Sequence, residues 1–149
     1  MYESLFMEQA IAEAKNAFYK NEVPVGAIVV KGNSICGKGH NNVISKTSVT
    51  AHAEIEAIND ASHFLQNYRL IDCDIYVTLE PCHMCLKAIL DARIKNLYFG
   101  ALEPKTGAVV SIDNFLDRTH HNHKLNFSGG FMEDNSSDLL KKFFHSRRS

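Results

Sequence analysis

The chain has 149 residues, which is the length of one ordinary domain, and we therefore expect a single domain over residues 1–149. Hydrophobic residues make up 45% and charged residues 22% of the sequence, which excludes an intrinsically disordered or fibrous protein. The formal net charge is -1, so the chain lacks the overall basic excess that is typical of nucleic-acid binders.

The apolar segments and the cysteines bear on the cellular location. No apolar run reaches the roughly 20 residues of a bilayer-spanning helix, and the polar start at Met1–Glu8 lacks the layout of a signal peptide. Two of the four cysteines lie three residues apart, which favours a metal site in a reducing compartment over a disulfide framework. We expect a soluble, cytoplasmic protein that has no membrane partner.

The first part of the chain is predicted to form a helix followed by a hairpin. Between Leu5 and Tyr19 the apolar residues recur at helical spacing, as on one face of an amphipathic helix. Val25–Val30 is an apolar run rich in β-branched residues, and a turn separates it from Ile35–His40. This pattern indicates two strands of a buried sheet.

The middle of the chain alternates helices and strands. A loop at Asn41–Ala51 leads into a helix from about His52 to Leu65. A strand is predicted at Ile75–Leu79, followed by a helix at Pro81–Ala92 that has proline at its first position. Leu97–Phe99 is predicted to be another strand. Because helices usually connect parallel neighbours, we expect parallel strands here.

The end of the chain is predicted to add a short strand at Lys124–Ser128 and a terminal helix whose capping residues lie within Asp134–Asp138. The expected buried stripe of this helix consists of Leu139, Leu140, Phe143 and Phe144. Together the elements predict an α/β fold with three layers, α/β/α.

Two short motifs about thirty residues apart carry the strongest chemical signal, His52-Ala53-Glu54 and Pro81-Cys82-His83-Met84-Cys85. Cys82 and Cys85 fall in a first helical turn, where the positive end of the helix favours the thiolates that bind metal. His52 is the expected third ligand, and two thiolates with one imidazole suit Zn²⁺. Three protein ligands leave the fourth tetrahedral position for water, as in catalytic zinc sites.

Glu54 stands two residues after the expected ligand His52. In a regular helix this spacing would point the two side chains to nearly opposite sides, so we expect the pair where the loop becomes a helix. Zinc lowers the pKa of a bound water to about 7, and a carboxylate beside it can carry the proton onward. The arrangement is typical of a hydrolytic deaminase in which Glu54 is catalytic.

Other interpretations of the same residues remain open at this point. Cys82 and Cys85 can form a redox pair, or the zinc can be purely structural with a fourth ligand. The candidates for that fourth ligand are His83, Cys36 and Cys73. Three further histidines, His120, His121 and His123, look like a metal cluster, but a solvated loop is the simpler interpretation and we predict no second zinc.

At these motifs the chain resembles the cytidine deaminase superfamily, whose signature pairs H-x-E with P-C-x-x-C and whose glutamate moves protons. The resemblance implies a cytidine-deaminase-like fold with a central mixed sheet of about five strands and helices on both faces. Within the superfamily the chain is most similar to the bacterial tRNA-specific adenosine deaminases, nearly from end to end. The similar segments are Asn21–Ala27, Thr50–Ile55, Leu79–Cys85, Lys105–Ala108, Asn122–His123 and Phe143–Arg148.

The resemblance implies hydrolytic deamination of adenosine to inosine at the wobble position of a tRNA anticodon. One Zn²⁺ per subunit would activate the water, and Glu54 would act as proton shuttle. Asn41 would hydrogen-bond the flipped base, although an asparagine there can also merely shape the loop. The resemblance also implies a homodimer.

The implied partner is a tRNA anticodon stem-loop, with no DNA partner. The last nine residues contain several basic and no acidic side chains, which suits RNA, although a basic helix end is also often only solvated. The candidate RNA contacts are Lys105, Phe144, Arg147 and Arg148. The sequence departs from the family pattern at Leu102-Glu103, where Arg-Asp is common, and at His40, where tryptophan is frequent.

Two competing functions use the same motifs. A deaminase of a free base or nucleoside, such as guanine or cytosine, would need the same zinc residues but no basic tail. A non-catalytic RNA-binding protein would keep zinc for structure alone, but it would have no use for Glu54, which is a proton carrier and not a zinc ligand.

Overall fold

The computed structural model describes residues 1–118 and 120–147, and apart from a short 3-10 turn the types and order of its elements follow the sequence prediction. The elements are α1 (Ser4–Tyr19), β1 (Gly26–Lys31), β2 (Ser34–His40), α2 (Ala53–Leu65), β3 (Cys73–Leu79), α3 (His83–Asp91), β4 (Asn96–Ala101), the 3-10 turn η1 (Phe115–Asp117), β5 (Asn126–Ser128) and α4 (Glu133–Arg147). One difference affects the site, since α3 begins at His83 and Cys82 is its N-cap, so Pro81 precedes the helix.

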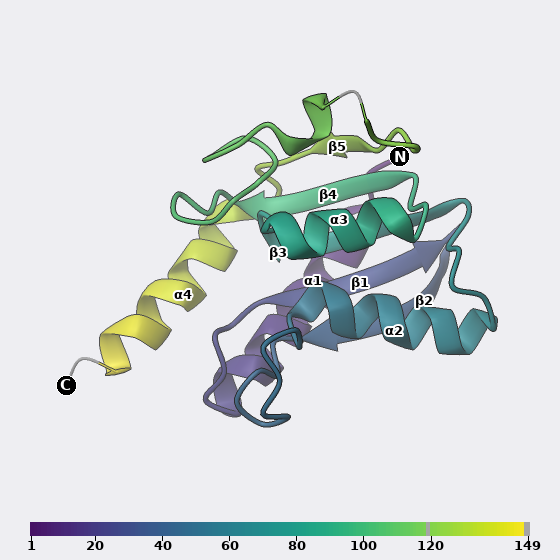
Figure 1. Ribbon diagram of the computed structural model, residues 1–149. Coiled ribbons are helices and arrows are strands. Elements are labelled where there is room, and N and C mark those ends of the chain that lie inside the picture. Colours follow the sequence, from purple (N-terminus) through teal and green to yellow (C-terminus); the bar gives the residue numbers. More distant parts are fainter. Residues whose placement is uncertain (119, 148–149) are drawn as a thin grey trace.

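The strands form one mixed sheet in the order β2-β1-β3-β4-β5 (Figure 1). β1 is antiparallel to both β2 and β3, whereas β4 is parallel to β3 and β5 is parallel to β4. The expected five-stranded mixed sheet and its parallel middle are therefore confirmed.

Helices cover both faces of the sheet, as predicted. α2 and α3 lie side by side on one face, where Ile58 and Leu86 pack into a core with residues of β1, β3 and β4 (Figure 1). α1 covers the opposite face, where Phe6 and Met7 pack against Ile28 and other side chains of the sheet. In the described parts of the chain, no helix is both long and apolar enough to cross a membrane.

The strand directions bring several connections to one end of the sheet. β2 and β3 point the same way because each is antiparallel to β1, and β4 is parallel to β3. The carboxyl ends of β2, β3 and β4 and the start of β1 therefore share one end, at which α2 and α3 begin. We call this the carboxyl end of the sheet, and it is where sites form in α/β proteins.

α4 has a narrower buried stripe than the sequence predicted. Phe143 is buried and its ring meets the Phe18 ring of α1 edge-on, but Phe144 is 46% exposed and Leu139 and Leu140 are only partly buried. The physical reason is that α4 extends past the sheet, so that only one side of the helix has a partner (Figure 1). The prediction that Phe144 is buried is wrong.

Two glycines let α2 lie directly on β2. A Cβ on Gly37 would overlap the Ala57 carbonyl oxygen, and one on Gly39 would overlap the Ala53 carbonyl oxygen in the first turn of α2. A side chain at either position would force the backbone of the helix away from the sheet. This close approach fixes the position of the N-terminus of α2.

We expect Gly39→Ala to lower the free energy of unfolding by about 1–3 kcal/mol, since overpacking against backbone cannot be relieved by a rotamer change. Urea denaturation followed by circular dichroism would measure the difference. Lys38→Ala is the matched control, because Lys38 is exposed on the same strand. Equal stability of the two variants would contradict the close contact between β2 and α2.

Candidate active site

Four chemically active side chains lie at the carboxyl end of the sheet, where the helices α2 and α3 begin. His52 is the N-cap of α2 and has an extended backbone (φ -73°, ψ 156°), whereas Glu54 belongs to the first helical turn. This change of backbone conformation confirms the expectation that the pair spans the transition from loop to helix. Cys82 is the N-cap of α3, and Cys85 lies in its first turn.

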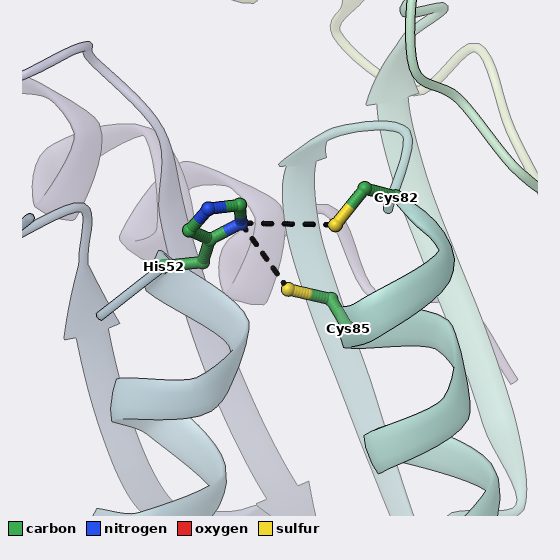
Figure 2. Close-up of side chains that lie close together, drawn as sticks. All are labelled: His52, Cys82 and Cys85. Atoms are coloured by element: carbon green, nitrogen blue, oxygen red, sulfur yellow. Dashed lines mark hydrogen bonds between the residues drawn. The ribbon is translucent and has the colours of Figure 1, made fainter. Parts of the chain in front are cut away.

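The ligand atoms of His52, Cys82 and Cys85 converge, as Figure 2 shows. His52 Nδ1 lies 3.5 Å from Cys85 Sγ and 3.8 Å from Cys82 Sγ, and the three atoms lie within 4.8 Å of one another. With Zn–S near 2.3 Å and Zn–N near 2.0 Å, tetrahedral zinc holds its nitrogen and sulfur ligands about 3.6 Å apart. The observed spacing therefore fits a metal ion such as zinc.

The alternative fourth ligands point elsewhere. His83 Nε2 hydrogen-bonds Asp113 Oδ2 at 2.8 Å, and Cys36 and Cys73 are buried in the core beside α2. Across residues 1–118 and 120–147, only His52, Cys82 and Cys85 form a group of histidine, cysteine or acidic side chains close enough to hold a metal ion.

Cys85 and Cys82 form a hydrogen bond in which Cys85 is the donor and Cys82 the acceptor. A hydrogen bond from Cys85, together with the His52 side chain, lowers the pKa of Cys82 to about 4. The same hydrogen bond and burial raise the pKa of Cys85, and the contact with Cys82 raises the pKa of His52. The cluster thus stabilises negative charge on sulfur, and a cation that binds there would stabilise the second thiolate as well.

Glu54 lies beside this cluster in a dry environment. Its side chain is only 4% exposed, and burial raises the pKa of its carboxyl group to about 7, with the negative charge at Cys82 adding to the effect. A carboxyl group with a pKa near the working pH can both accept and release a proton.

A cavity of about 340 Å³ opens above these residues. Its floor contains His52, Glu54 and Cys82, and its walls come from the connections at the carboxyl end of the sheet. The wall residues are Glu22, Val23, Val25, Asn41, Val43, Ile44, Leu79, Glu80, Glu103 and Thr106. A small planar ligand can therefore reach both the metal-binding group and Glu54.

Comparison with known proteins identifies the family. The family model of MafB19-like deaminases matches residues 1–148. A tRNA-specific adenosine deaminase from Aquifex aeolicus is 44% identical over 100% of this chain and 98% of its own length. A solved structure from studies of A-to-I editing by tRNA:A34 deaminases has a TM-score of 0.90 and 41% identity, over 93% of this chain and 100% of that one.

The chain belongs to the tRNA-specific adenosine deaminase family. The fold is also shared with a guanine deaminase from Bacillus subtilis, which is 30% identical with a TM-score of 0.67 over 100% of this chain and 96% of that one. The family resemblance inferred from the sequence is thus confirmed, as is the cytidine-deaminase-like fold.

Two positions named from the family pattern are next to each other at the end of β2. Asn41 is partly buried and lines the cavity, and its backbone N–H donates to the Val25 carbonyl at 3.0 Å. His40 instead turns toward α1, where Nδ1 lies 3.2 Å from Glu13 Oε1 and Nε2 lies 3.3 Å from Lys20 Nζ. His40, which stands where the family frequently has tryptophan, therefore packs on α1 and does not form part of the cavity wall.

The candidate RNA residues lie outside the cavity. Lys105 is exposed in the loop after β4, and Phe144 is exposed on α4. Arg147 donates to the Asn21 carbonyl and its guanidinium lies 4.6 Å from the Phe143 ring centre, so it fastens the end of α4 to the chain after α1. Arg148 lies outside the described residues.

The histidines after η1 also bind within the protein. His121 Nε2 lies 2.8 Å from the Phe115 carbonyl oxygen, and His123 Nε2 lies 2.6 Å from that of Ile94. These contacts join the loop to η1 and to the connection between α3 and β4.

Sequence reasoning missed two buried carboxyl groups of the cavity wall, Glu22 and Glu80. Glu22 is fully buried and accepts hydrogen bonds from the backbone N–H groups of Ile44 (3.1 Å) and Ser45 (2.6 Å). Burial opposes the charged form, but these bonds hold the pKa of Glu22 below its usual value. The sequence signal that could have found them is an acidic residue near an apolar strand segment, since Glu22 lies shortly before one such segment and Glu80 directly after another.

Proposed function

We propose that this protein hydrolyses adenosine to inosine at the wobble position of a tRNA anticodon, as one deaminase domain over residues 1–149. The convergence of a histidine and two cysteines beside the buried carboxyl group of Glu54, at the floor of an open cavity, carries this proposal. Membership of the tRNA-specific adenosine deaminase family supports it, and so do two relatives of this name that match 100% and 96% of the chain.

His52, Cys82 and Cys85 would hold one zinc ion per subunit. A zinc ion held there supplies Lewis-acid activation of water. The N-terminal ends of α2 and α3 add positive potential at this point, which supports the negative charge on the two sulfurs.

Glu54 moves the protons of the reaction. Its carboxylate takes a proton from the attacking water and delivers it to N1 of the adenine ring, while the water oxygen bonds to C6. Glu54 then transfers a second proton from the new hydroxyl group to the amino group. The C6–N6 bond breaks, so that ammonia leaves and inosine remains.

Asn41 orients the base. Asn41 lines the cavity together with the apolar residues Val25 and Val43. The amide offers a donor and an acceptor together, which suits the edge of a purine that has been turned out of the anticodon loop.

The anticodon stem-loop would bind across the carboxyl end of the sheet. The bond from Arg147 to the Asn21 carbonyl links the end of α4 to the residue that precedes Glu22 of the cavity wall, and the exposed ring of Phe144 on α4 would stack on a base of the RNA. Lys105 precedes Thr106 of the wall, and Lys105 and Arg148 would each add a positive charge for phosphate contacts. We propose in addition that the enzyme is a cytoplasmic homodimer.

Removal of one ligand side chain should remove the metal. We expect about one zinc per chain in the wild type and in Cys36→Ala, and much less in His52→Ala and Cys85→Ala. Cys36 is the matched control, since it is a buried cysteine outside the group. Elemental analysis by mass spectrometry would measure the ratio. A Cys85→Ala protein that retains its zinc would contradict the proposed ligands.

Glu54→Gln should lower inosine formation by about 10²–10⁴-fold, because the amide cannot carry a proton, while zinc content and tRNA affinity stay the same. The measurement is inosine content in a panel of unmodified tRNA transcripts, alongside ammonia release from free adenosine, guanine and cytosine. Conversion of a free base alone would replace the tRNA assignment. A fully active Glu54→Gln protein would contradict the proton shuttle.

Loss of the exposed ring on α4 should weaken RNA binding. We expect Phe144→Ala to raise the KM for tRNA by about 5- to 150-fold, as loss of one stacked base does, with little change in kcat. Phe64→Ala is the matched control, because Phe64 is an exposed phenylalanine near the far end of α2. Equal KM values for both variants and the wild type would exclude Phe144 from the RNA surface.

A further inference from the structure

The loop after β4, residues 102–111, forms one wall of the cavity although it contains no helix or strand. Glu103 and Thr106 of this loop line the cavity, and Lys105 lies exposed between them. Only a few backbone bonds link the loop to itself or to its surroundings, such as those from Gly107 to the Glu103 carbonyl and from Ala108 to the Pro81 carbonyl. Because these backbone bonds are few, further contacts are needed to fix the position of the loop.

The carboxyl group of Glu80 occupies the centre of the loop. Its side chain is 2% exposed, and backbone N–H groups donate to it from Glu103 (3.1 Å), Val109 (3.1 Å), Val110 (2.8 Å) and Ser111 (3.0 Å). The Ser111 hydroxyl group donates to it as well. Both carboxylate oxygens are used, and the donors come from both ends of the loop.

Gly107 shows independently that the loop is shaped around this carboxylate. A Cβ at position 107 would overlap Oε1 of Glu80, so only glycine lets the loop close to this distance. No described residue forms a salt bridge with Glu80. The buried negative charge is therefore compensated by the convergent N–H groups, which lose their partner if the carboxylate is removed.

We propose that Glu80 is a positioning residue that fixes the 102–111 loop as the substrate-binding wall of the cavity. Glu80 directly follows β3 and is separated from Cys82 by Pro81 alone, so its side chain joins the loop to the start of α3. The wall keeps a set distance from the metal-binding group as a result. Lys105 and the exposed side chains of Leu102 and Val110 are thereby presented to the RNA.

This inference rests on the proposed function for its substrate, but the anchoring itself can be measured without any substrate. Glu80→Gln keeps the size of the side chain and turns an amide NH₂ toward the N–H donors. Gly107→Ala disturbs the same contact from the loop side, and Ser111→Ala removes a single donor as the mildest change. Asp91→Asn is the control, since it removes an exposed carboxylate at the opposite end of α3.

Hydrogen exchange is the first readout. In Glu80→Gln and Gly107→Ala we expect the amides within residues 103–111 to exchange at least about tenfold faster, with α2 unchanged and zinc retained. Unchanged exchange in this loop, or equal acceleration throughout the protein, would overturn the proposal. This readout holds even if the wild type converts no tRNA, an outcome that would refute the proposed function alone.

Kinetics separates positioning from chemistry. Loss of hydrogen bonds to a charged group should raise the KM for tRNA by about 10- to 100-fold in Glu80→Gln, with kcat within about threefold of the wild type. Ser111→Ala should show a smaller change in the same direction, and Asp91→Asn none. A fall in kcat at unchanged KM would overturn the proposal, because it would place Glu80 in the chemical step.

Discussion

The site depends on the opposite direction of β1 relative to its two neighbours. Because β1 runs against both β2 and β3, the latter strands end together, and the helices that follow them begin together. His52 is the N-cap residue of one of these helices and Cys82 that of the other, so two residues that are thirty positions apart in the sequence lie close together. The glycines of β2 add the close approach that fixes α2, and with it His52, against the sheet.

Three buried glutamates of the cavity show how surroundings assign different roles to one residue type. Glu22 accepts hydrogen bonds from two backbone N–H groups and Glu80 from four, which hold the pKa of each below its usual value despite burial, so both remain negatively charged. Glu54 is buried beside the negatively charged Cys82, and its pKa rises to about 7. Only Glu54 is thus placed to exchange a proton near neutral pH, while the other two anchor loops.

The fold and the metal-binding group were predictable because their signals are local. Apolar spacing gave the helices and strands, and the motifs that contain His52 and Cys82 each lie within one helix start. The anchors were not predictable, since the donors to Glu22 and Glu80 lie more than twenty residues away and are backbone groups with no sequence signature. Phe144 was assigned to the core because helical spacing cannot tell which side of α4 lacks a partner.

The near-neutral charge of the chain is compatible with an RNA surface once burial is considered. Glu22, Glu54 and Glu80 count toward the formal charge, yet each is at most 4% exposed inside the cavity wall or floor. Removing these three negative charges from the formal total of -1 leaves +2 for the rest of the chain. The acidic residues of the site therefore mask a small excess of basic over acidic residues in the rest of the chain, which includes the exposed Lys105 and the basic residues of α4. Composition alone argues against a nucleic-acid partner only where the acidic residues are themselves exposed.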